Sequence, residues 1–142
     1  MTCMLFGHRD APDAIRTDLK NAIISLTLDY GVTEFLVGNN GSFDAMSQGV
    51  LSELRHLGLD INYSIVLSKL NEIPISGENN RTLFPEGQED ALHRFAISKR
   101  NDWMLRQADV LLTFVRNKFS NSYKVLSKAL AKGIKAINLY NG

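Results

Sequence analysis

Two glycine-marked turns hold the residues of this chain whose types and spacing could bind an anion. Gly7–Asp10 follows the apolar run Met4–Phe6, and Gly38–Ser42 follows the apolar run Phe35–Val37. Each turn is followed by a predicted helix. The first residues of a helix have backbone N–H groups without partners at the positive end of the helix dipole, and these groups suit a phosphate or a carboxylate. Two such turns in one chain favour the binding of a small nucleotide-like molecule.

The first turn offers three residues that a ligand could contact. Gly7 permits backbone angles that other residues avoid. Arg9 presents a planar set of N–H donors that matches a phosphate or carboxylate, and His8 could bind a ligand or donate a proton. An ordinary surface turn with a solvated arginine would use the same residues, because glycine is common before polar side chains in turns. Both interpretations stay open.

The second turn is more specific, because two glycines flank two residues that tolerate left-handed backbone geometry. These four residues are Gly38, Asn39, Asn40 and Gly41. Ser42 is expected to cap the following helix, and Asp44 either caps that helix or binds a ribose hydroxyl, with capping preferred. The turn lacks the third glycine of a G-x-G-x-x-G motif and the lysine of a P-loop, so it matches neither motif completely.

A third group of polar residues belongs to a predicted helix at Arg94–Gln107. Asn101 falls on the apolar face of this helix, where a buried, unpaired amide would cost about 1–3 kcal/mol. We expect it either to bond the backbone of a neighbouring loop or to reach into a ligand cleft. Arg100, together with Arg94 and Lys99, could supply local positive charge to that cleft, although a solvated basic face is the usual explanation of such a run.

The composition is that of a soluble globular protein. The chain has 142 residues, of which 44% are hydrophobic and 22% charged, which is enough for one domain over residues 1–142. With a net charge of +1 and 8% aromatic residues, we do not expect nucleic acid or a membrane surface as a partner. No apolar stretch reaches the roughly 18 residues of a membrane span and no signal segment is visible, so we expect a cytoplasmic protein.

Cysteine and histidine usage predicts no metal site. Cys3 is the only cysteine, which excludes an internal disulfide and a multi-cysteine zinc site, and we expect its thiol in the core. His56 and His93 are isolated, and no spacing of histidines and carboxylates matches a set of metal ligands. We therefore expect neither a metal nor a cofactor.

Apolar runs that alternate with helical patterns predict an α/β fold. The expected strands are Thr2–Phe6, Glu34–Val37, Asn62–Leu67, Val110–Val115 and Ile134–Leu139, and the expected helices are Pro12–Tyr30, Phe43–Leu57, Arg94–Gln107 and a last helix around Val125–Leu130. This order implies a mostly parallel five-stranded sheet covered on both faces, a Rossmann-like three-layer domain. Ligands bind such sheets beyond the carboxyl ends of the strands, so the turns after the first, second and fourth strands are the expected site.

One long segment, Ser68–Leu92, matches neither a helix nor a strand. It contains many turn-forming residues, namely Pro74, Gly77, Asn79, Asn80, Pro85 and Gly87. Long irregular segments in compact domains are often lids or binding loops. We expect this segment either to cover a ligand or to form a surface excursion.

Four motifs in the same order along the chain resemble short bacterial members of the SLOG superfamily. They are Phe6–Arg9, Val37–Asp44, Phe84–Gly87 and Arg94–Met104. The resemblance spans nearly the whole chain and implies a Rossmann-like fold that binds nucleotides or nucleotide-derived ligands. Relatives include phosphoribohydrolases, a DNA-processing protein and sensor domains for ADP-ribose-type signals. By position, the resemblance implies ligand contacts from Gly7, His8, Arg9, Gly38, Asn39, Gly41, Asp44, Arg100 and Asn101.

The chain departs from this family after its fourth predicted strand. Where relatives have a Gly-Gly pair, it has Ser120-Asn121, and the acidic residue of hydrolytic relatives is missing from the next helix. The loss of glycine restricts how closely the backbone can approach a phosphate. Asn121 could still cap the helix and accept a positive φ, so Ser120 and Asn121 remain candidate ligand contacts. The missing carboxylate argues more strongly against hydrolysis.

These observations favour a domain that binds a nucleoside monophosphate or an ADP-ribose-type ligand as a sensor or sequestering module. One alternative is a nucleoside-monophosphate N-glycosidase that uses Asp44 or Glu86 as acid/base, with His8 orienting the ligand, because these carboxylates lie nearest the predicted cleft. Another alternative is a module that binds proteins or single-stranded nucleic acid. The resemblance also makes a homo-oligomer plausible, although the sequence does not indicate through which surface.

Overall fold

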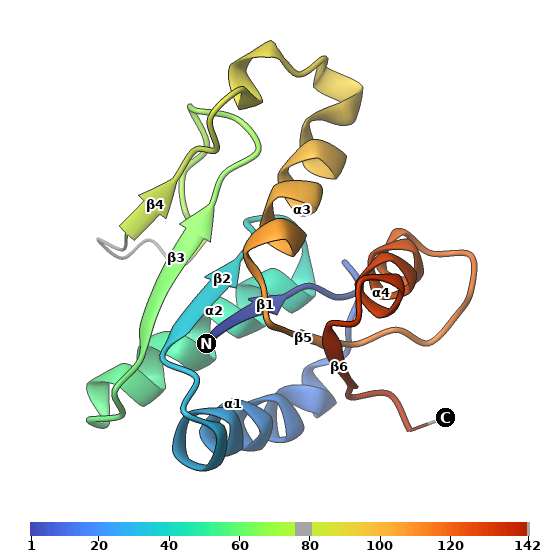
Figure 1. The fold of residues 1–142 in the computed structure, drawn as a ribbon. Helices are drawn as coiled ribbons and strands as arrows, with labels where there is room; N and C mark the ends of the chain where they lie inside the picture. The colour runs from blue at the N-terminus through green and yellow to red at the C-terminus, as the bar shows by residue number, and fades with distance from the viewer. Residues whose placement is uncertain (76–80, 142) are drawn as a thin grey trace.

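The computed structural model describes residues 1–75 and 81–141 (Figure 1). Gly77, Asn79 and Asn80, named above as turn-forming residues, lie outside the described residues. The strands are β1 (Thr2–Leu5), β2 (Glu34–Val37), β3 (Asn62–Val66), β4 (Arg81–Leu83), β5 (Val110–Thr113) and β6 (Lys135–Asn138). The α-helices are α1 (Arg16–Tyr30), α2 (Ser42–His56), α3 (Ala96–Gln107) and α4 (Asn121–Ala131), and short 3₁₀ turns lie at Asp13–Ile15, Gln88–Asp90 and His93–Phe95.

The predicted α/β architecture is confirmed, with small shifts at the ends of elements. β2 has the predicted bounds. The helix predicted from Pro12 starts later, because Pro12 has extended backbone angles and is followed by a 3₁₀ turn before α1. Gly31 ends α1 with a φ of 71°, a left-handed conformation that glycine adopts easily at the end of a helix.

The described strands form one parallel sheet of six strands, not the predicted five, in the order β4-β3-β2-β1-β5-β6. The additional strand, β4, lies in the segment that was predicted to be irregular. It has only three residues and two of them are exposed, so it carries no apolar alternation that could reveal it. Arg81 attaches β4 to the sheet, because its Nε donates to Ser64 Oγ of β3 at 2.5 Å and its Nη2 pairs with Glu34 of β2 at 3.0 Å.

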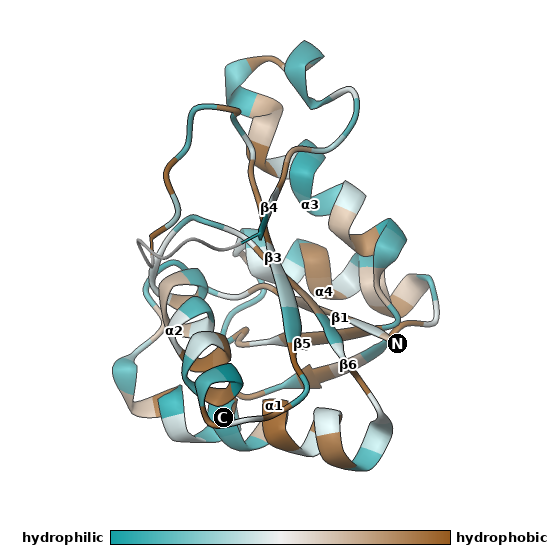
Figure 2. Ribbon diagram, turned by 90° about the vertical axis from the view of Figure 1, so that its left-hand side faces the viewer, coloured by the Kyte–Doolittle hydropathy of each residue, from teal (hydrophilic) through white to brown (hydrophobic). Residues whose placement is uncertain are grey.

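Helices cover both faces of the sheet. α1 and α2 pack together on one face, and α3 and α4 pack together on the other (Figure 1). Figure 2 shows the hydrophobic stretches of the strands between these helix layers. Cys3, Leu5 and Val37 point into the core on the α1 and α2 side, while Met4 and Leu36 belong to the core on the α3 and α4 side. Among the described residues, no helix is long and apolar enough to cross a membrane.

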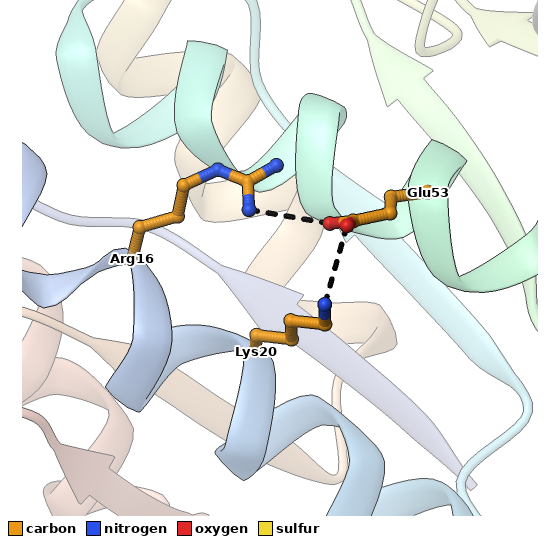
Figure 3. Close-up of polar contacts among 3 residues, drawn as sticks. All are labelled: Arg16, Lys20 and Glu53. Carbon is orange, nitrogen blue, oxygen red and sulfur yellow. Dashed lines mark hydrogen bonds and ion pairs between the residues drawn. The ribbon is translucent and has the colours of Figure 1, made fainter.

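An ion-pair cluster joins α1 to α2 (Figure 3). Glu53 accepts from Arg16 Nη1 and from Lys20 Nζ, each at 3.2 Å, and these two bonds lower the pKa of Glu53. Arg16 and Lys20 are one helical turn apart, so both reach the same carboxylate. Because the three side chains are partly exposed, the cluster orients the two helices more than it stabilises them.

The order of the strands locates the position where a ligand is expected to bind. β1 lies between β2 and β5, so the chain moves in one direction across the sheet after β1 and in the other direction after β5. Such a topological switch point leaves a crevice outside the carboxyl ends of the two central strands. The turns after β1 and β5 flank this switch point, and we call the region between them the crevice; the turn after β2 lies next to them.

Candidate functional site

The glycines of the first two turns leave room for neighbouring protein atoms. A Cβ on Gly7 would lie 2.6 Å from the ring of Phe43, and a Cβ on Gly41 would lie 2.7 Å from the Cα of Arg9. The backbone N–H of Ser42 also donates to the carbonyl of Arg9 at 2.8 Å. The two turns are thus packed directly on each other. Of the glycines in these turns, only Gly41 has a positive φ, so the unusual backbone angle expected at Gly7 is not present.

His8 connects the turn after β1 with the turn after β5. Its Nε2 accepts the backbone N–H of Arg116 at 2.9 Å, and the backbone N–H of His8 donates to the carbonyl of Phe114 at 3.3 Å. Burial and the nearby Arg116 guanidinium lower the pKa of His8, which favours the neutral ring that the bond to Nε2 requires. His8 therefore holds the two sides of the crevice together.

Arg116 is fixed at the same crevice by two contacts of its side chain. Its Nη2 pairs with Asp10 at 2.7 Å, and its guanidinium lies 5.7 Å from the centre of the Phe114 ring. Arg9, from the turn after β1, and Lys118, from the turn after β5, are exposed. Sequence reasoning included Arg9 in the site and missed Arg116 and Lys118, because isolated cations in a polar turn carry no distinctive spacing.

Asp44 is buried at the start of α2. Its Oδ2 accepts the backbone N–H of Asn40 at 2.9 Å, which satisfies a donor just before the helix. Burial raises its pKa to about 6, and the charge of Arg100 opposes this rise. The prediction that Ser42 caps α2 is wrong: Gly41 occupies the N-cap position, and the hydroxyl of Ser42 donates to the carbonyl of Ala11 at 2.7 Å.

Arg100 is completely buried at the carboxyl ends of β2 and β3. Its Nη1 donates to the carbonyl of Val66 at 3.0 Å and to Asn40 Oδ1 at 3.3 Å, and its Nε donates to Asn101 Oδ1 at 2.9 Å. Asn101, which is also buried, thus has the neighbouring guanidinium as a partner and not the loop backbone that was considered above. Arg100 therefore does not supply exposed positive charge.

Gly38 separates Arg100 from Asp44. A Cβ at this position would lie 2.6 Å from Asp44 Oδ2 and 2.9 Å from Arg100 Nη1, so both charged groups press against the glycine. Asp44 Oδ1 and Arg100 Nη2 are buried without a hydrogen-bond partner among the described residues. Each of the two side chains that press against Gly38 thus also has one buried polar atom without a partner among the described residues.

Asn39 holds the segment Ser68–Ile75, which we call the strap, against the turn after β2. Its side-chain amide donates to the carbonyl of Ile73 at 2.9 Å and accepts the N–H of Ile75 at 2.8 Å. It also contacts Glu72, whose carboxylate is near enough to raise the pKa of Asp44. Asn39 is therefore occupied by protein partners. Glu72 was missed because it lies in the part of the sequence that showed no pattern.

The turn after β5 begins α4 in a way that differs from the prediction. Ser120 is the N-cap residue, and its Oγ accepts the N–H of Tyr123 at 3.1 Å. Asn121 is the first residue of α4 and is exposed; no described residue other than glycine has a positive φ. Asn121 therefore neither caps the helix nor adopts the left-handed conformation that was considered above.

Glu86, the second acid/base candidate, is exposed in the turn before Gly87. The structure records no hydrogen bond or ion pair for it among the described residues. The segment around it forms a hollow of about 310 Å³, lined in part by Ser68, Phe84, Gln88 and Ala96. Gln88, one of the lining residues, donates from Nε2 to the carbonyls of Ser68 and Ala96 and so joins the two sides of the segment. The described part of the long segment thus both covers Asn39 and forms a surface excursion.

The fold resembles that of two solved bacterial proteins. The structure of DNA processing protein A from Streptococcus pneumoniae matches with a TM-score of 0.73 and 11% identity, over 96% of this chain and 49% of that chain. The protein of the same name from Helicobacter pylori matches with a TM-score of 0.70 and 12% identity, over 97% of this chain and 64% of that chain. No protein-family model and no curated protein sequence matches. At these identities the likeness establishes the Rossmann-like fold.

The comparison corrects one expectation. From net charge and aromatic content, nucleic acid was not expected as a partner. The Helicobacter pylori structure, however, describes how a protein of this fold binds single-stranded DNA. The near-neutral composition is therefore no ground for excluding nucleic acid, because binding depends on where the charges lie on the surface and not on their sum.

Proposed function

We propose that this chain is a nucleic-acid-binding domain that holds a single strand at the crevice between the turns after β1 and β5. The observation that carries the proposal is the placement of Arg9, Arg116 and Lys118 on these two turns, which His8 and Asp10 hold together. The crevice lies at the switch point of a parallel sheet, where this type of fold binds its ligands.

The local charge at this crevice is positive although the chain is nearly neutral. Asp10 is the carboxylate that faces Arg116, and it is already paired. The first turn of α4 contains no acidic residue, and Lys124 adds an exposed cation there. A polyanion in contact with such a surface releases its condensed counterions, and this gives binding that weakens as salt rises.

Two finer assignments belong to the same proposal. The four sequence motifs support membership of the SLOG superfamily, and the continuous sheet supports one domain over residues 1–142. The Helicobacter pylori protein supports single-stranded DNA as the first nucleic acid to test. This chain spans 49% of the matched Streptococcus pneumoniae chain and 64% of the Helicobacter pylori chain. The proposal therefore concerns only a function that this fold could carry by itself.

Fluorescence anisotropy with a labelled oligothymidylate tests the proposal. The variant Arg9→Gln/Lys118→Gln removes two exposed cations at the crevice, while Lys132→Gln/Lys135→Gln removes two exposed cations at the opposite, amino-terminal ends of the strands. We expect the first variant to bind more weakly and to lower the slope of log Kd against log salt by about 1.4, at about 0.7 for each phosphate contact. The second variant should bind like the wild type.

Two results would contradict this proposal. One is no binding of the wild type at low salt. The other is equal weakening by the two variants, because they remove the same net charge from different places. A variant that unfolds would mislead, so circular dichroism spectra of all proteins are compared first.

A second candidate function, binding of a free nucleotide or ADP-ribose-type ligand, is favoured by the orphaned atoms Asp44 Oδ1 and Arg100 Nη2, which belong to the two side chains that press against Gly38. A ligand group that has both a donor and an acceptor, such as a ribose hydroxyl, would satisfy both atoms. Isothermal titration with AMP, ADP-ribose and cyclic nucleotides tests it. Binding should weaken in Asp44→Asn, which keeps the shape of the side chain, and in Arg9→Ala. Unchanged binding in both variants would refute this candidate. We do not propose the N-glycosidase, because Asp44 is buried with Oδ2 on the backbone N–H of Asn40, and Glu86 is an exposed residue of the long segment after β4.

A further inference from the structure

One aromatic side chain beside the crevice has no part in the core. Phe119 lies in the turn between β5 and α4, and 97% of its surface is exposed. The backbone around it is nevertheless ordered by hydrogen bonds. Its N–H donates to Asn117 Oδ1 at 3.1 Å, and the next residue, Ser120, caps α4. The protein therefore holds an exposed aromatic ring on a turn whose backbone is fixed on both sides.

We propose that Phe119 is a stacking platform for an unpaired base of the nucleic-acid strand, with Lys118 and Arg116 beside it for the phosphates. This inference rests on the proposed function and adds to it the contact that would favour single strands. Stacking on an aromatic ring accepts any base, because every base has a flat face. A duplex offers no free base face along its length, so the ring would contribute only to binding of a single strand.

The position of Phe119 differs from that of the other exposed apolar residues. Leu28 and Leu130 are single exposed residues on α1 and α4, and Leu57 lies at the end of α2. Single exposed residues of this kind need no explanation. Phe119 lies instead in the turn that follows β5, directly after Lys118 and just before the cap of α4, whose first turn contains no acidic residue.

The charges around the ring argue for a polyanion as the occupant. A protein partner that buried Phe119 in an apolar pocket would also have to desolvate Lys118 and Arg116, at a cost unless it supplied carboxylates. A nucleic-acid strand offers a base and a phosphate in each nucleotide, so it matches an aromatic ring with cations on one turn.

The test combines three substitutions of Phe119 with titration by an oligothymidylate at low salt. In Phe119→Trp, the new indole should be quenched as the strand binds, beyond any change that Trp103 gives in the wild type. In Phe119→Ala, Kd should rise about tenfold, the low end for loss of one stacked base, with an unchanged salt slope because no charge is lost. Phe119→Tyr should bind like the wild type. Leu57→Ala, which removes an exposed apolar side chain far from the crevice, is the matched control.

The outcomes separate this inference from the proposed function. If the oligonucleotide binds and Arg9→Gln/Lys118→Gln weakens it, but Phe119→Ala binds like the wild type and the new indole of Phe119→Trp is not quenched, the platform is wrong and the nucleic-acid interface stands. If no strand binds, both fail. Quenching of that indole by a free mononucleotide without strand binding would overturn the assignment to a strand. Because the ring is exposed, all three variants should melt at the wild-type temperature.

Discussion

Asp44 and Arg100 show how residues of opposite charge can be buried together without a direct ion pair. Each uses part of its hydrogen-bonding capacity on the backbone, Asp44 on the N–H of Asn40 and Arg100 on the carbonyl of Val66. Gly38 lies between them, and the remaining atoms Asp44 Oδ1 and Arg100 Nη2 have no described partner. Burial raises the pKa of Asp44 in spite of the nearby guanidinium, so desolvation is the larger effect.

The raised pKa of Asp44 predicts a pH-dependent stability. The folded protein has a pKa of about 6 at this carboxyl, compared with an ordinary value of 3.8, so the folded state binds more protons between these pH values. The free energy of unfolding should therefore fall as pH rises through this window, by up to about 3 kcal/mol, and stay lower above it. Asp44→Asn removes this ionisation. We expect the stability of the variant relative to the wild type to rise from about pH 4 to about pH 7.

Urea unfolding of the wild type and Asp44→Asn at these two pH values measures the difference directly. Because other titrating groups are common to both proteins, their contributions cancel to first order. A stability difference that does not change with pH would contradict the burial of an ionising carboxylate at this position.

At the scale of elements, the turn after β1 and the start of α2 form one packed unit. Gly7 accommodates the ring of Phe43, and Gly41 accommodates the backbone of Arg9. The strap is attached to the same unit through Asn39. The glycine pattern that suggested a phosphate site thus also allows two turns to pack closely on each other. This close packing places Arg9 beside the crevice.

Two glycines of neighbouring elements give a matched pair of substitutions. Gly7→Ala places a Cβ 2.6 Å from the buried Phe43 ring, and such overpacking should destabilise the protein by about 1–3 kcal/mol. Gly49→Ala, in the middle of α2, meets no atom closer than 4.0 Å and should stabilise the protein by about 0.5–1 kcal/mol through helix propensity. Thermal or urea unfolding measures both. If both substitutions changed the free energy of unfolding equally, the contact with the Phe43 ring would not be what requires glycine at position 7.

Asn39 should act as the attachment point of the strap. Leu70 and Ile73 of the strap are largely exposed, so the hydrogen bonds of Asn39 and of Glu72 hold this segment more than apolar burial does. In Asn39→Ala we expect the amide of Ile75 to lose protection in hydrogen exchange while amides of the central strands keep theirs. Asn39→Asp retains the acceptor for Ile75 and should protect it partly. Equal protection of Ile75 in all three proteins would show that the strap is held in another way.

At the scale of the whole molecule, the strand order determines which turns meet. β5 pairs with β1 although more than a hundred residues separate them, and this pairing brings Arg116 to His8 and Asp10. The positive crevice is therefore a property of the tertiary structure. The sum of charges over the chain is only +1, because cations and anions elsewhere on the surface balance those of the crevice.

The sequence by itself determined the architecture. Buried runs such as Phe35–Val37 and Val110–Thr113, with glycines and polar turns between them, specify strands that must be covered on both faces. It did not reveal β4, because three mostly exposed residues have no period of their own and are held by pairing with β3 and by Arg81.

Only the tertiary structure decided the roles of the polar residues. The sequence placed Gly7, Asn39 and Arg100 in one site, but their partners Phe43, the strap and Val66 come from other elements, and such contacts leave no trace in local spacing. For the same reason it could not assign Ser120 rather than Asn121 as the cap, nor place Phe119 beside the crevice. Local pattern fixes elements because their hydrogen bonds and apolar faces repeat along the chain, whereas a site forms from single residues that only the packed fold brings together.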